Sequence, residues 1–158
     1  MPATESSVHD AAVWLDADTV IQGDIAELAA MATDNGKTAV FVKNSNETED
    51  LLHFLNPSGK TRHLLERLQV PNSTRSYNIG VFAVNLGLWR KKRVAERLAR
   101  WARYNQEHHL WFSGTNALMM SAFLIPDPED SDPVRAREIV GDFVVAPRGW
   151  NFARLGLP

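Results

Sequence analysis

A short hydrophobic run that ends abruptly at two carboxylates constrains the fold of this chain most strongly. Residues 11–15 read Ala-Ala-Val-Trp-Leu, which predicts a buried strand, and Asp16-Ala17-Asp18 follows at once. In an extended chain, residues i and i+2 point to the same side, so both carboxylates would converge on one point. Because adjacent carboxylates repel each other, holding both ionised at the end of a buried strand needs a compensating cation.

The acidic pair has two interpretations. Hard divalent ions such as Mg²⁺ or Mn²⁺ bind oxygen ligands and keep open positions for substrate phosphates. Sheets of α/β proteins bind ligands at the carboxyl ends of their strands, which favours a metal–diphosphate site with Asp16 and Asp18 as metal ligands. The alternative is a solvated turn whose carboxylates cap nearby backbone N–H groups.

Strand and helix patterns alternate along the rest of the chain. Asp24 and Glu27 predict the capped start of a helix over 25–31. Further strands are expected at 19–21, 38–42, 79–86 and 139–147, and further helices at 49–55, 59–69, 88–106 and 115–124. This order predicts a single α/β domain over residues 1–158, with a mostly parallel or mixed sheet.

Charge and composition exclude several classes of protein. The 158 residues include no cysteine, which excludes thiolate zinc sites and cysteine nucleophiles. Residues 1–50 hold ten acidic and two basic side chains, whereas residues 89–103 hold seven basic and one acidic. On that basic helix Trp101 shares an apolar stripe with Val94 and Leu98, so we expect a core tryptophan and no nucleic-acid partner. No apolar run is long enough to predict a membrane segment in this chain.

One enzyme class that uses such an acidic pair is the haloacid-dehalogenase-like phosphatases. Residues 16–21, Asp-Ala-Asp-Thr-Val-Ile, resemble the nucleophile motif of that family. The resemblance would make Asp16 the nucleophile and Asp18 the general acid. That family also needs a late acidic pair for Mg²⁺, whereas Gly141-Asp142 is followed only by apolar residues. The phosphatase is therefore the alternative function.

Three segments, in the family's own order, resemble glycosyltransferase family 8. They are VWLDADTVIQGDIAEL at 13–28, SYNIGVFAVNLGLWR at 76–90 and APRGWNF at 146–152. The resemblance covers residues 11–157, and residues 76–104 look like the eukaryotic glycosyltransferase-8-domain proteins of the Golgi. It implies a GT-A-like mixed sheet flanked by helices.

The resemblance also implies an activity and a site. The activity is transfer of a hexose, with retention of configuration, from a nucleotide-sugar such as a UDP-sugar to a carbohydrate or glycoconjugate acceptor. Asp16 and Asp18 would ligate Mn²⁺ (or Mg²⁺), and Ala17 would lie beside the ribose-diphosphate. Asn78 would hydrogen-bond a sugar, and Gly80 would let the backbone approach closely. Asn78 can also be read as an ordinary turn residue that bonds its own backbone.

The chain departs from the family pattern in three places. Where the family has an Asp-Gln-Asp segment, residues 114–118 read Gly-Thr-Asn-Ala-Leu, so no catalytic residue is assigned and Asn116 could at most donate a hydrogen bond. The nucleotide-binding strands before the acidic pair and the later His-x-x-Gly-x-x-Lys-Pro-Trp segment are missing, which predicts a partial domain truncated at both ends. The resemblance implies a Golgi location for a full-length eukaryotic protein, and in other cases the location is cytoplasmic or is not specified by the sequence. A non-catalytic remnant that binds a partner is the remaining hypothesis.

Overall fold

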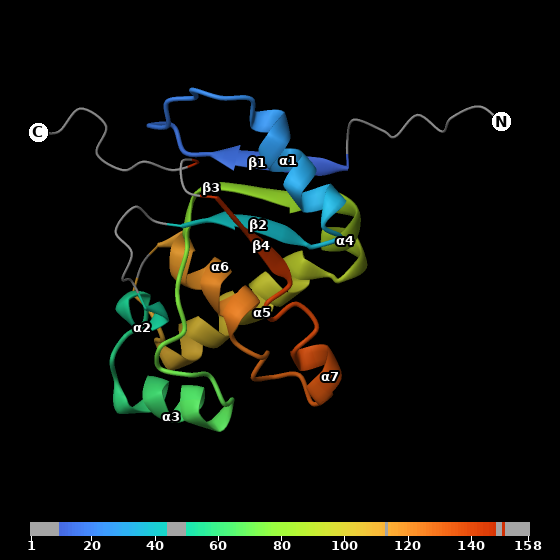
Figure 1. Cartoon of the computed structure of the whole chain (residues 1–158). Helices are drawn as coiled ribbons and strands as arrows, with labels where there is room; N and C mark the ends of the chain where they lie inside the picture. The colour runs from blue at the N-terminus through green and yellow to red at the C-terminus, as the bar shows by residue number, and fades with distance from the viewer. Residues whose placement is uncertain (1–9, 44–49, 113, 148–149, 151–158) are drawn as a thin grey trace, which may run out of the picture.

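Four strands form one mixed sheet in the computed structural model of the chain, which describes residues 10–43, 50–112, 114–147 and 150 (Figure 1). They are β1 (Ala11–Leu15), β2 (Ala39–Val42), β3 (Asn78–Asn85) and β4 (Phe143–Ala146). The sheet order is β1-β3-β2-β4, in which β3 pairs antiparallel with both β1 and β2, and β2 pairs parallel with β4. The expected mixed sheet is therefore confirmed, although its pairings are mainly antiparallel.

Helices cover both faces of this sheet (Figure 1). They are α1 (Ile25–Asp34), α2 (Leu51–Phe54), α3 (Gly59–Arg67), α4 (Leu86–Lys91), α5 (Val94–His108), α6 (Thr115–Leu124) and α7 (Pro133–Ala136). Helix α1 lies on one face, while α4, α5 and α6 lie on the other. No helix in the described part of the chain combines the length and the apolar character needed to cross a membrane.

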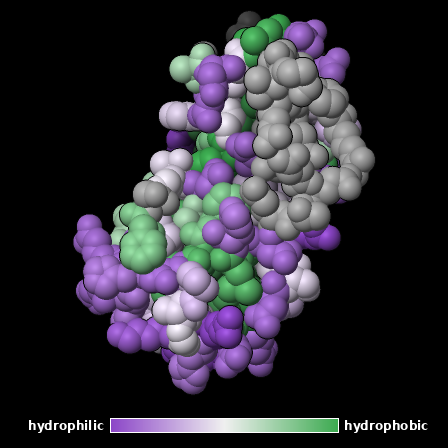
Figure 2. All heavy atoms as spheres, turned by 90° about the vertical axis from the view of Figure 1, so that its left-hand side faces the viewer, coloured by the Kyte–Doolittle hydropathy of each residue, from purple (hydrophilic) through white to green (hydrophobic). Residues whose placement is uncertain are grey.

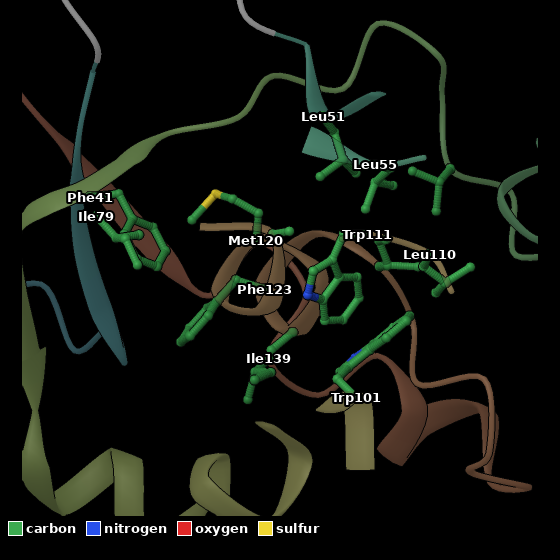
Figure 3. Packing of buried hydrophobic residues seen from close by; sticks show 14 of the residues in the cluster. Phe41, Leu51, Leu55, Ile79, Trp101, Leu110, Trp111, Met120, Phe123 and Ile139 are labelled. Carbon is green, nitrogen blue, oxygen red and sulfur yellow. The ribbon is translucent and has the colours of Figure 1, made fainter. Parts of the chain in front are cut away.

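The larger core lies between the sheet and α5 and α6 (Figure 3). Phe41 of β2 meets Phe123 of α6 edge to face, with ring centroids 5.1 Å apart, a favoured arrangement for two aromatic rings. Trp101 of α5 is 1% exposed, which confirms its expected place in the core. A smaller core on the opposite face joins Leu28 and Ala32 of α1 to apolar residues of the strands.

Two of the elements expected from the sequence differ in the structure. The strand expected at 19–21 lacks a neighbouring strand among the described residues, and the helix expected over 88–106 is interrupted by a change of direction. Residues 19–21 form no strand, and Val20 and Ile21 are 66% and 56% exposed. Residues with high β propensity form a strand only where a neighbouring strand can pair with them, and none lies beside this segment in the described part of the chain. The helix expected over 88–106 is two helices, because Arg93 takes a left-handed conformation with φ of 53° between α4 and α5.

The two outer strands also differ from expectation. Strand β1 is not buried but lies at the edge of the sheet, where alternate side chains face solvent and Trp14 is 56% exposed. Strand β4 begins at Phe143 rather than at residue 139, because Gly141, with φ of 72°, makes a turn just before it. Ile139 instead packs in the larger core.

A buried arginine joins α5 to the chain after α6. The guanidinium of Arg97 donates from Nε to the carbonyl of Ala122 at 2.9 Å, from Nη1 to Ala136 at 2.8 Å and from Nη2 to Ile125 at 2.7 Å. Burial lowers the pKa of Arg97 to about 10, and the nearby Asp127 carboxylate opposes that shift. One of the basic residues of this helix, Arg97, is therefore buried and serves to hold the fold together.

We predict that Arg97→Lys lowers the free energy of unfolding by about 2–3 kcal/mol, because an ammonium group cannot reproduce the three-way fork and leaves buried carbonyls unpaired. Urea unfolding followed by circular dichroism measures this. Arg103→Lys, an exposed position on the same helix, should stay within about 0.5 kcal/mol of wild type. Equal stabilities for the two variants would contradict the role assigned to Arg97.

A buried carboxylate holds the start of β2 and the end of α4 to the turn before β4. Asp142 accepts hydrogen bonds from Lys92 Nζ at 2.6 Å and from the Thr38 hydroxyl, and Lys37 Nζ lies 3.6 Å away. Burial would raise the pKa of Asp142, but the bonds from Lys92 and Thr38 outweigh it, and the pKa lies below its ordinary value. The ionised form therefore stabilises the fold.

We predict that Asp142→Asn lowers the free energy of unfolding by about 1–2 kcal/mol at pH 7 because Lys92 loses its counterion. The stabilisation is complete above about pH 4, the ordinary aspartate range, and falls as pH drops through the lower pKa of the folded state. Urea midpoints of wild type and variant should therefore converge in acid. A difference that stays constant down to pH 2.5 would contradict this account, and Glu129→Gln in the exposed loop is the control.

Candidate functional site

The antiparallel pairing of β1 with β3 brings the first aspartate of the acidic pair to Gly80. Trp14 pairs with Phe82 and Leu15 with Val81, and the ladder continues one step further, where the Asp16 N–H donates to the Gly80 carbonyl at 2.8 Å. Two segments more than sixty residues apart in the sequence are thereby fixed side by side.

Two side-chain oxygens converge over the Cα of Gly80. A methyl group placed there would lie 2.8 Å from Asp16 Oδ2 and 3.0 Å from Asn78 Oδ1. Gly80 is buried, so only a residue without a side chain leaves this space to the two oxygens. The close approach expected at Gly80 is thus present, and it is made by the protein's own carboxylate and amide.

Asn78 bonds its own backbone, as its reading as a turn residue proposed. Its Oδ1 accepts the Gly80 N–H at 2.6 Å, which fixes the direction of the amide. A carbonyl oxygen has a second lone pair, so this bond leaves Asn78 Oδ1 able to take a further donor or a cation. The role of Asn78 toward a sugar stays a prediction.

Asn116 lies at the start of α6 and bonds the same stretch of β3. Its Oδ1 accepts the Ile79 N–H at 3.2 Å, which leaves the amide nitrogen as the donor, and a bond from that nitrogen to a substrate stays a prediction. Two residues before Ile79, the Tyr77 N–H donates to the sulfur of Met120 in the same helix at 3.3 Å. Helix α6 therefore supports the strand segment that carries Asn78 and Gly80.

Ala17 and Asp18 leave the strand direction. Strand β1 ends at Leu15, and the Thr19 N–H donates to the Asp16 carbonyl at 3.0 Å to close a turn through these two exposed residues. The extended geometry that would align Asp16 with Asp18 is replaced by this turn. The atoms nearest the space over Gly80 belong to Asp16 and Asn78. Metal ligation by Asp18 stays a prediction.

Trp14 is a site residue that the sequence reasoning missed. Its indole Nε1–H donates to Asp16 Oδ1 at 3.0 Å, and its ring stacks on Phe82 with centroids 6.2 Å apart. The available signal was the spacing, because residues i and i+2 of a strand share a face. Reading residues 11–15 as fully buried hid that signal.

The oxygen set fits a hard divalent cation. Mg²⁺-type sites use one or two protein carboxylates, keep several waters and take further ligands from substrate phosphates. Asp16 Oδ2 and Asn78 Oδ1 supply protein oxygens at one point, and the exposed position of Asp16 leaves room for other ligands. Across the described residues, no three His, Cys, Asp or Glu side chains gather to hold a metal ion.

The site lies at an end of the sheet. Strand β1 ends and β3 begins on the left-hand side of Figure 1, which is the side that faces the viewer in Figure 2. Hydrophobic side chains show in the middle of this face between hydrophilic ones (Figure 2). Asp142, the carboxylate considered for the phosphatase, is instead buried between two lysines. This pairing does not favour the phosphatase alternative.

A mixed sheet flanked by helices, with an acidic turn at the end of an edge strand, is consistent with a partial GT-A-like fold. The sequence profile of Glycosyl transferase family 8 matches residues 8–157, and the chain belongs to this family. The expected family membership is therefore confirmed. No solved structure matches the chain.

Curated relatives agree with this assignment. The chain is 27% identical to bovine glycosyltransferase 8 domain-containing protein 1 over 109 residues, which cover 63% of this chain and 29% of that protein. It is 28% identical to bovine glycosyltransferase 8 domain-containing protein 2 over 117 residues, 66% of this chain and 33% of that one. Human glycosyltransferase 8 domain-containing protein 1 is 26% identical over 109 residues. The matches thus span about a third of the length of these relatives.

We predict that Gly80→Ala weakens Mn²⁺ binding about ten-fold while the protein stays folded, because the new methyl group displaces the oxygens of Asp16 and Asn78. Isothermal titration with MnCl₂ measures the affinity, and the melting temperature monitors the fold. Gly59→Ala is the matched control, since a methyl group there meets nothing within 4 Å. Wild-type affinity in Gly80→Ala would show that the space over Gly80 is not part of the site.

Proposed function

We propose that this chain carries the cation–diphosphate site of a glycosyltransferase that takes a hexose from a UDP-sugar and passes it, with retention of configuration, to a carbohydrate or glycoconjugate acceptor. Asp16 and Asp18 would hold Mn²⁺ or Mg²⁺, with Asn78 as a neighbouring oxygen. Family membership supports the glycosyltransferase class. The donor, the stereochemistry and the acceptor are part of the proposal.

The observation that carries the proposal is the convergence of Asp16 Oδ2 and Asn78 Oδ1 over Gly80. Both side chains are held by other bonds, Asp16 by the Trp14 indole and Asn78 by the Gly80 N–H. A preorganised pair of oxygens loses little side-chain freedom on binding a cation, which favours affinity. Two oxygens of a solvated turn would not need to meet at a buried glycine.

Different residues of the site would contact different parts of the nucleotide-sugar donor. A divalent cation bound at Asp16 and Asp18 would offset the negative charge that develops on the departing diphosphate. Ala17, between the two aspartates, has a side chain small enough to let ribose and phosphate approach the turn. Asn78 presents an amide whose nitrogen is available to donate to a hydroxyl of the sugar, because its oxygen already bonds Gly80.

We predict that UDP binds the wild-type chain only when Mn²⁺ is present, and that Asp16→Asn and Asp18→Asn each weaken this binding at least ten-fold by removing a charged ligand. Isothermal titration with UDP, with and without MnCl₂, measures it. Glu107→Gln, an exposed charge on α5, is the control and should bind as wild type.

Three outcomes separate the hypotheses. Binding that is independent of metal, or unchanged in a combined Asp16→Ala and Asp18→Ala variant, would refute the cation site. Hydrolysis of a phosphate monoester that disappears in Asp16→Asn would instead support the phosphatase. Binding without any transfer from UDP-sugars would support the non-catalytic remnant.

A further inference from the structure

The ring of Trp14 is exposed to solvent, whereas its one polar atom, Nε1, makes a hydrogen bond within the protein. The side chain is 56% exposed at the edge of the sheet. Its ring lies against Phe82 at an interplanar angle of 21°, opposite it in the β1–β3 ladder. Aromatic cross-strand pairs of this kind stabilise a sheet, so the stack favours this position of the indole ring. Trp14 is therefore supported by Phe82 although it is largely outside the core.

The indole N–H of Trp14 donates to the carboxylate of Asp16. Nε1 of Trp14 lies 3.0 Å from Asp16 Oδ1, while Oδ2 of the same carboxylate is the atom that lies over Gly80. The two oxygens thus have separate partners. Because Asp16 is exposed, packing alone does not hold its side chain in one position. The hydrogen bond from the indole supplies that restraint.

We propose that Trp14 is a positioning residue of the cation site, which holds the Asp16 carboxylate so that Oδ2 is directed to the bound ion. This inference rests on the proposed function, because it assigns Trp14 to the metal site of that reaction. An indole N–H can only donate and does not titrate, so it orients the carboxylate without competing for the cation. Partners of this kind, bonded to the second oxygen of a ligand, commonly tune metal affinity.

The stacking and the hydrogen bond can be tested apart. Trp14→Phe keeps an aromatic ring opposite Phe82 and removes the donor. We expect its Mn²⁺ affinity to fall about ten-fold with a melting temperature close to that of wild type. Trp89→Phe, a partly buried tryptophan of α4 that packs near Phe123, is the matched control and should keep the wild-type affinity. Mn²⁺ electron paramagnetic resonance in the absence of nucleotide measures free and bound metal directly.

A second measurement leaves Trp14 in place. In ¹H–¹⁵N spectra of the metal-free full chain, the indole signal that is absent from Trp14→Phe belongs to Trp14. We expect this signal to shift in Asp16→Asn, which replaces the charged acceptor, and to shift on addition of Mg²⁺. The same signal should be broadened more than those of the other indoles by a small amount of Mn²⁺, because Trp14 is the one bonded to Asp16.

The outcomes distinguish this inference from the function on which it rests. If wild type binds Mn²⁺ and Asp16→Asn does not, but Trp14→Phe binds as wild type, Trp14 has no positioning role and the cation site stands. An indole signal unmoved by Asp16→Asn also overturns the inference. If wild type itself binds no Mn²⁺, the cation site and the role of Trp14 are both refuted.

Discussion

The antiparallel register between β1 and β3 is the constraint on which the site depends. It pairs Trp14 with Phe82 and carries the ladder to the bond between Asp16 and Gly80. A slip of one residue would turn every side chain of β1 to the opposite face. Val13 and Leu15 pack toward α1, so the apolar face of β1 resists that slip. The packing of two hydrophobic residues therefore fixes where the carboxylate lies.

Much of the fold could be predicted because local patterns coincide with the elements. Residues 11–15 and 115–124 form a strand and a helix at their expected bounds, and Asp24 caps α1 by accepting the Ala26 N–H. The break at Arg93 was not visible, because basic helix-forming residues continue through it. After this left-handed turn, α5 places Arg97 and Trp101 in the interior, and such long-range packing is not encoded in the local sequence.

The residues of the candidate site could be selected from the sequence, whereas the contacts between them could not. Asp16, Asn78 and Gly80 could be selected from motifs, since Asp16 follows one apolar run and the other two residues stand at the start of another. That Asp16 and Asn78 meet over Gly80 depends on cross-strand register, which the sequence of either strand alone does not contain. Trp14 was overlooked for the same reason, because its exposure follows from the place of β1 at the edge.

The contact between α6 and β3 limits which amino acids can stand at position 116. The Ile79 N–H needs an oxygen acceptor at the reach of a short side chain, and Asn116 supplies it. A carboxylate of the same length could also accept this N–H, so aspartate would keep the backbone contact while it adds a negative charge and removes the two amide N–H donors. The strand can thus keep its support from α6 while the charge and the hydrogen-bond donors at this end of the sheet change.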